Sequence, residues 1–177
     1  LSTEQIYEYV PLGPLRHIYA VFMPAEIQLD VLNTANCYIA PELLRDYSFD
    51  ATVQGNGCAT LNIAPQRLSG AYARLIWETG TQANSVISSL GYDGSRIRFR
   101  TGTQQGNALI GLFDTWGECV WSWHIWVTDY NPESSSQKYS SGDIFMDRNL
   151  GAVGTDYTKV TACGLYYQWG RKDPFPY

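Results

Sequence analysis

The stretch GNALIGLFDTWGECVWSWHIWV, residues 106–127, has the pattern of two long strands joined by a tight turn. Apolar and aromatic residues dominate 107–113 and 118–128, and Asp and Gly within 114–117 supply the turn. Because alternate side chains of a strand point to opposite faces, one face of the second strand is wholly apolar. That face is predicted to pack in a core and consists of Trp121, Trp123, Ile125 and Val127.

The opposite face of the same strand mixes polar and aromatic residues, among them Ser122, His124 and Trp126. Two interpretations fit this mixture. Either a later segment of the chain covers this face, or Trp126 stays open and stacks on a sugar ring. His124 has no second histidine at a spacing typical of metal ligands, so we expect a structural histidine and no metal site.

A second hairpin is predicted in SVISSLGYDGSRIRFR, residues 85–100, where an Asp-Gly turn separates two alternating segments. Its second strand has a dry face and a cationic face, the latter carrying Arg96, Arg98 and Arg100. Further strands are expected at 26–32, 36–39, 47–53 and 73–79. About eight short strands with turns at intervals of roughly 8–12 residues predict an all-β, antiparallel sandwich.

The composition excludes several classes of protein. In 177 residues, hydrophobic side chains make up 45% and charged ones only 16%, a balance typical of a globular domain. The formal net charge of -5 and the absence of a basic stripe argue against a nucleic-acid partner. The sequence contains no apolar run approaching the roughly 20 residues of a membrane-spanning helix.

The chain divides into four predicted parts. Residues 1–30 contain three prolines and are expected to form an extended arm or the end of a preceding domain. Residues 31–130 form the β-sandwich, and the serine-rich residues 131–142 form a linker. Residues 143–177 regain aromatic content and are interpreted either as the start of a second module or as a strap packed on the sandwich.

Motifs for catalysis and cofactor binding are missing from the sequence. The four cysteines, at 37, 58, 119 and 163, include no C-x-x-C pair, and they allow up to two disulfides with the pairing left open. The sequence contains no G-x-S-x-G elbow. The stretch GTQQGN, residues 102–107, lacks the lysine of a phosphate-binding loop. We therefore predict no catalytic residue, metal or cofactor.

Three stretches resemble one known family, and together they place the resemblance over residues 31–177. These are TANCYIAPELLRDYSFDATVQGNG (34–57), ARLIWET (73–79) with GNALIGLFDTWGECVWSWHIWVTDYNP (106–132), and FMDRNLGA (145–152) leading into GLYYQWGRKDPF (164–175). They are similar to exported Bacteroidales surface proteins related to fimbrillin-type pilus tip subunits and anchored adhesins. The resemblance implies an immunoglobulin-like sandwich, followed by the first part of a C-type-lectin-like module of the major-paralogue type.

The resemblance also implies a location and partners. It predicts a non-enzymatic structural or adhesive protein of the cell surface, peripheral to the outer membrane through an anchor outside this chain. Its partners would be other pilus or surface subunits, joined by strand addition. The alternative is a carbohydrate-binding module for host or dietary glycans. The residues expected to contact a ligand or the strap are Trp116, His124, Trp126, Arg148, Trp169 and Arg171.

Overall fold

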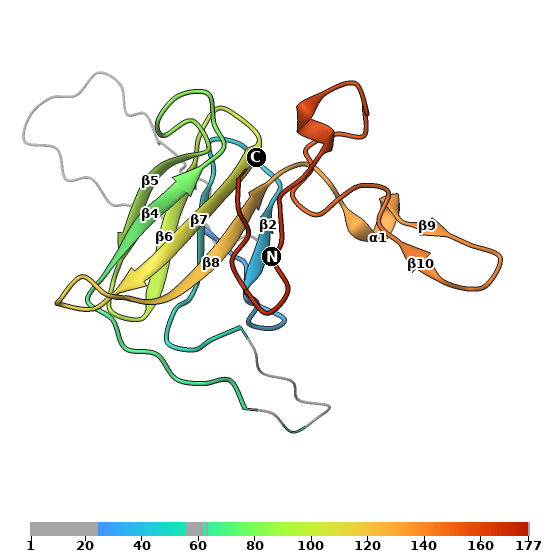
Figure 1. Cartoon of the computed structure of the whole chain (residues 1–177). Helices are drawn as coiled ribbons and strands as arrows, with labels where there is room; N and C mark the ends of the chain where they lie inside the picture. The colour runs from blue at the N-terminus through green and yellow to red at the C-terminus, as the bar shows by residue number, and fades with distance from the viewer. Residues whose placement is uncertain (1–24, 56–61, 63, 177) are drawn as a thin grey trace, which may run out of the picture.

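The computed structural model describes residues 25–55, 62 and 64–176, which form two facing four-stranded sheets and a C-terminal extension (Figure 1). The first sheet has the strand order β1-β3-β6-β5, and the second has the order β2-β8-β7-β4. The strands are β1 (Ile27–Gln28), β2 (Cys37–Ala40), β3 (Asp46–Asp50), β4 (Tyr72–Glu78), β5 (Ile87–Tyr92), β6 (Arg96–Thr101), β7 (Gly106–Phe113) and β8 (Cys119–Val127). The expected all-β sandwich is confirmed.

Both sheets are mixed, whereas the sequence pattern predicted antiparallel pairing throughout. β1 pairs parallel with β3, and β2 pairs parallel with β8. Residues 29–36 carry the chain from the edge of one sheet to the edge of the other, so neither β1 and β3 nor β2 and β8 are joined by a tight turn, which would make them antiparallel. The resulting strand order corresponds to the two sheets of the immunoglobulin fold, with β1 and β2 sharing the role of its first strand.

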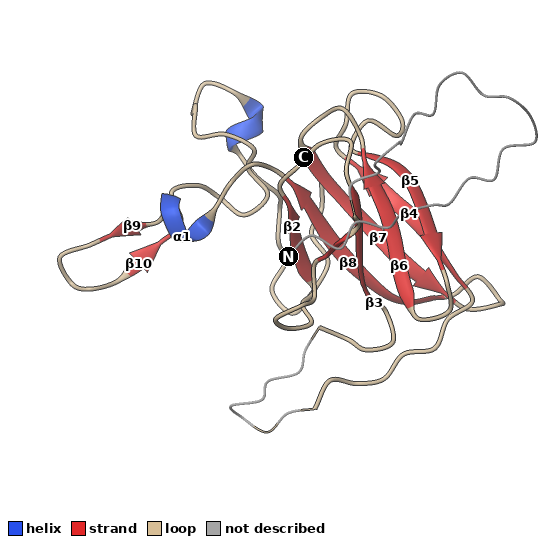
Figure 2. Ribbon diagram, turned by 180° about the vertical axis from the view of Figure 1, so that it is seen from behind, coloured by secondary structure: helices blue, strands red, loops and turns tan. Residues whose placement is uncertain are grey.

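The core lies between the sheets and is rich in aromatic side chains. Trp123 of β8 packs on Phe49 of β3 with ring centroids 5.2 Å apart, and Phe49 also stacks on Tyr38 of β2 at 5.0 Å. The predicted apolar face of β8 is confirmed, because Trp123, Ile125 and Val127 are fully buried and Trp121 packs at the margin of the same core. β8, one of the two inner strands of the second sheet, therefore supplies a large part of the core (Figure 2).

In the hairpin of β5 and β6, the strand β6 has the predicted apolar face and the predicted cationic face. Ile97 and Phe99 are buried in the core. On the outer face, Arg96 forms an ion pair with Asp30 at 2.5 Å, and Arg100 forms one with Asp46 at 2.7 Å. Because Asp30 lies just after β1, the Arg96–Asp30 pair attaches that two-residue strand to the rest of its sheet.

The stretch expected to be a linker carries short elements of its own. Asn131 caps the helix α1 (Pro132–Ser135) by accepting a hydrogen bond from the backbone N–H of Glu133. A hairpin follows, formed by β9 (Gln137–Lys138) and β10 (Ile144–Phe145), and it projects away from the sandwich (Figure 1). Gly142 has a φ of +94°, the left-handed conformation that its turn requires.

Most of the expected arm at residues 1–30 lies outside the described residues, as does Cys58. Within the described residues, the arm contributes only β1.

Cys37, Cys119 and Cys163 are free thiols, so no disulfide joins any two of these three described cysteines. No helix in the described part of the chain is long and apolar enough to cross a membrane.

Candidate functional site

The mixed face of β8 is covered by the C-terminal segment, residues 146–176. Ser122, His124 and Trp126 are each at most 4% exposed. The last residues of the chain run along the outer side of the second sheet (Figure 1). Ala152 and Leu165 are the buried hydrophobic residues of this segment, and side-chain hydrogen bonds attach it to the sandwich at two places.

Lys172 and Asp173 attach the end of this segment to the centre of β8. The Lys172 ammonium donates to the backbone oxygen of Ser122 at 2.8 Å and to its hydroxyl oxygen at 2.6 Å. The Ser122 hydroxyl in turn donates to the Asp173 carboxylate at 2.7 Å, and Lys172 also pairs with Asp173. The ammonium lies 4.5 Å from the Trp121 ring centroid, within range of a cation–π contact.

A second attachment is a chain of buried hydrogen bonds that begins at Cys37 and ends on Gly151. The Nδ1 atom of His124 lies 3.1 Å from the Cys37 sulfur, and its Nε2 lies 2.9 Å from Oδ1 of Asn107. The Asn107 amide nitrogen donates to the backbone oxygen of Gly151 at 2.8 Å. Since Oδ1 of Asn107 can only accept, Nε2 of His124 carries the proton, and the Cys37 thiol donates to Nδ1.

This Cys37–His124–Asn107 chain has the order of a nucleophile, a base and an orienting amide, but it has the opposite electronic character. Burial raises the pKa of the Cys37 thiol to about 12 and lowers the pKa of His124 to about 4. Both groups are therefore neutral at pH 7, whereas a reactive cysteine needs a thiolate stabilised by a positive neighbour. In this arrangement the hydrogen bonds hold the Gly151 backbone, and the Cys37 thiol is not activated as a nucleophile.

Trp126 and Arg148 meet around Tyr130. The Trp126 ring is 1% exposed and lies 5.3 Å from the Tyr130 ring, so it presents no open face to solvent. The Arg148 guanidinium lies 4.3 Å from the centroid of the Tyr130 ring and pairs with Asp147 at 2.7 Å. The structure thus brings His124, Trp126 and Arg148 to the boundary between the sandwich and the C-terminal segment.

The other predicted contact residues do not join this group. Trp116 lies in the β7–β8 turn and is 86% exposed, and Trp169 is fully exposed. Arg171 lies over the Phe175 ring at 4.1 Å, within the segment itself. The residues that sequence reasoning missed are Cys37 and Asn107. The sequence offered one signal for Asn107, since a polar amide within the otherwise apolar stretch 106–113 indicates a buried side chain that needs hydrogen-bond partners.

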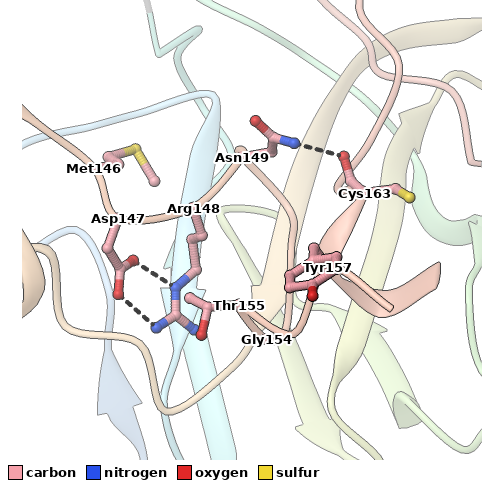
Figure 3. Close-up of a pocket in the computed structure, with 9 residues that line it drawn as sticks. Met146, Asp147, Arg148, Asn149, Gly154, Thr155, Tyr157 and Cys163 are labelled. Carbon is pink, nitrogen blue, oxygen red and sulfur yellow. Dashed lines mark hydrogen bonds and ion pairs between the residues drawn. The ribbon is translucent and has the colours of Figure 1, made fainter. Parts of the chain in front are cut away.

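An open pocket of about 420 Å³ lies within the C-terminal segment (Figure 3). The Asp147–Arg148 pair and the Asn149 amide, which donates to the Cys163 backbone oxygen at 3.1 Å, line one part of it. Tyr157, which is 93% exposed, and Thr155 line another part. Planar polar side chains beside an exposed aromatic ring are a combination suited to a polar ligand such as a sugar.

Within the described residues, no group of three or more His, Cys, Asp and Glu side chains is arranged to hold a metal ion. In comparisons with protein-family models, with curated proteins and with solved structures, no match to this chain is found.

Proposed function

We propose that this chain is a non-enzymatic structural or adhesive protein of the bacterial cell surface, a pilus tip or accessory subunit. The observation that carries the proposal is the buried series of hydrogen bonds that runs from Cys37 through His124 and Asn107 to Gly151. The groups that most resemble a reactive constellation are neutral, and their hydrogen bonds end on the backbone of the C-terminal segment. The sandwich then acts as a scaffold that presents this segment.

The exposed side chains of the segment support a role in recognition. Tyr157, Tyr166 and Trp169 are between 64% and 100% exposed, an unusual display for aromatic residues. Exposed aromatic residues are typical of surfaces that bind partners or glycans. The resemblance of residues 31–177 to Bacteroidales pilus tip and adhesin proteins agrees with such a role.

Strand addition by a partner subunit would occur at the edge formed by β1 and β2. The opposite edge strands, β4 and β5, each contain an irregularity of register, after Leu75 and after Ile87. Such bulges discourage pairing with another chain. Among the described residues, β1 pairs with only two residues of β3, and no described strand lies on its other side, which favours this edge for an incoming strand.

The test is photo-crosslinking in the native bacterium, with a photoreactive amino acid at Gln28 in the full-length protein. We expect a covalent adduct with another surface subunit, and recovery of the protein in the outer-membrane or pilus fraction. The matched control is the same amino acid at Ser89, an exposed position on the other edge of the same sheet. Equal adducts from both positions would argue against the edge, and a purely cytoplasmic protein would refute the function.

A carbohydrate-binding module is the second candidate, and the pocket with the exposed Tyr157 ring favours it. A glycan array probed with the full-length protein and with Tyr157→Ala tests it. Loss of binding in the variant would place glycan recognition in this pocket, and an array without any bound glycan would remove this candidate.

A further inference from the structure

We propose that the cleft between the sandwich and the C-terminal segment binds a short, uncharged saccharide. The cleft is separate from the pocket of Figure 3 and has a volume of about 360 Å³. This volume falls at the lower end of the range of about 300–1,000 Å³ that is typical of small-molecule sites. The proposal rests on the adhesive function proposed above, for which it supplies the class of ligand.

The cleft is built from segments that are far apart in the sequence. Its sandwich wall comes from the loop that follows β4, with Thr79 and Thr81, and from the loop that precedes β7, residues 104–107. Its other wall comes from the C-terminal segment, with Val153 and Thr161. The glutamine-rich GTQQGN stretch, which is unsuited to phosphate, thus forms one side of a cavity.

The hydrogen bond from Asn107 to Gly151 joins the two walls. Asn107 lines the cleft, is itself held by His124, and donates to the Gly151 backbone oxygen at 2.8 Å. Gly151 has a φ of +86°, and a Cβ atom there would lie 2.7 Å from Leu165 and 3.1 Å from Oδ1 of Asn107. A glycine is therefore required where the two walls meet. The hydrogen bonds through His124 and Asn107 hold this glycine in place and so fix one wall of the cleft against the other.

The chemistry of the lining selects the class of ligand. The lining residues are Thr79, Thr81, Gln104, Gln105, Gly106, Asn107, Gly151, Val153 and Thr161, none of which is ionisable. A phosphate or carboxylate ligand binds most strongly to a cationic side chain, and this lining offers none. An apolar ligand would leave the amide and hydroxyl groups without partners. Neutral amides and hydroxyls, which both donate and accept, instead match the hydroxyl groups of a neutral sugar.

Two side chains are free to bind such a ligand. Thr81 and Gln104 already bond to each other, with Gln104 donating to the Thr81 hydroxyl at 2.9 Å. Gln105 and Thr161 also line the cleft, and within the described residues their side chains make no hydrogen bond. None of the residues that line the cleft belongs to an edge strand, which disfavours pairing with an extended peptide as its occupant.

The experiment measures binding of the full chain to neutral and to sialylated or sulfated oligosaccharides on an array, followed by calorimetry with the best neutral ligand. We expect neutral glycans to bind and the double variant Gln105→Leu, Thr161→Val to bind about tenfold or more weakly, because two neutral hydrogen bonds are lost. Thr103→Val is the matched control, since Thr103 is exposed in the same loop but outside the lining. Thermal unfolding of each variant checks that the fold is intact.

Three results would overturn the proposal. They are binding confined to acidic glycans, no glycan binding at all, or neutral-glycan binding that the double variant retains and Tyr157→Ala loses. The last would assign recognition to the pocket of Figure 3. Crosslinking from Gln28 to another surface subunit would survive each of these results, so failure of the cleft remains distinguishable from failure of the proposed function.

Discussion

His124 and Asn107 share a buried hydrogen bond in which Nε2 of the histidine lies 2.9 Å from Oδ1 of the asparagine. Both side chains come from the second sheet, from β8 and β7, and both are almost completely buried. The same asparagine uses its amide nitrogen to hold Gly151. The pair therefore links the sandwich to the C-terminal segment, and its protonation state bears on the stability of that link.

We expect the protein to lose stability in acid through His124. Burial lowers the pKa of His124 in the folded state to about 4, while in the unfolded chain it is about 6.5. Between these values the unfolded state binds more protons, so the free energy of unfolding decreases as the pH falls from about 6.5 to 4, by roughly 3 kcal/mol in total. Urea unfolding measured across this range would detect the change.

The control for this prediction is His124→Gln, which keeps a side-chain amide able to donate to Asn107 and removes the titrating ring. The variant should lack the histidine part of the acid slope. An identical dependence of unfolding free energy on pH in both proteins would contradict the assignment to His124.

The thiols should differ in reactivity in a Cys58→Ser background. Cys119 and Cys163 are exposed, whereas burial raises the pKa of Cys37 to about 12. Because the thiolate is the reacting species, iodoacetamide should label Cys119 and Cys163 in the native protein and Cys37 only after unfolding. Peptide mapping by mass spectrometry would assign the sites, and rapid native labelling of Cys37 would refute the buried neutral chain.

Trp123→Ala should destabilise the sandwich by roughly 3–5 kcal/mol, because it removes a fully buried ring that packs on Phe49. Trp116→Ala is the matched control, since Trp116 is 86% exposed and its removal should change the free energy of unfolding by less than about 0.5 kcal/mol. Chemical denaturation followed by circular dichroism would compare the two. Equal effects would show that Trp123 is not a core residue.

The Arg96–Asp30 ion pair should hold β1 on its sheet above the acid range. Burial of Asp30 acts to raise its pKa, but hydrogen bonds from Arg96 and from the backbone of Asp50 outweigh burial and lower it. The contribution is then present above the usual aspartate pKa of about 4 and is lost as the pH falls through the lower folded-state value.

Asp30→Asn tests this at neutral pH. Hydrogen exchange at the Leu29 amide, which donates to the backbone oxygen of Ser48, should become faster in the variant. The amides of the central strand β7 provide an internal control that should not change. Unaltered exchange at Leu29 would mean that the ion pair does not retain β1.

Much of the sandwich could be predicted from local pattern. The period of two in 118–128 identified Trp123, Ile125 and Val127 as core residues, and the Asp-Gly turn between 85 and 100 identified a hairpin with buried Ile97 and Phe99. Both signals work because the alternation of side chains along a strand is a local property of the backbone. β1 pairs parallel with β3, and β2 pairs parallel with β8. Each pairing depends on which sheet edge the strand reaches, and no local pattern encodes that choice.

The sequence by itself determined an all-β chain with one strongly apolar strand face and a mixed one, since alternation and turn residues are read over a few positions. Only the tertiary structure decided what the mixed face does. Cys37, Asn107 and His124 lie on three different strands, and Gly151 and Lys172 come from a segment far along the chain. Hydrogen bonds between such distant residues require the sheets to be assembled first, so they follow from the packing of the whole chain.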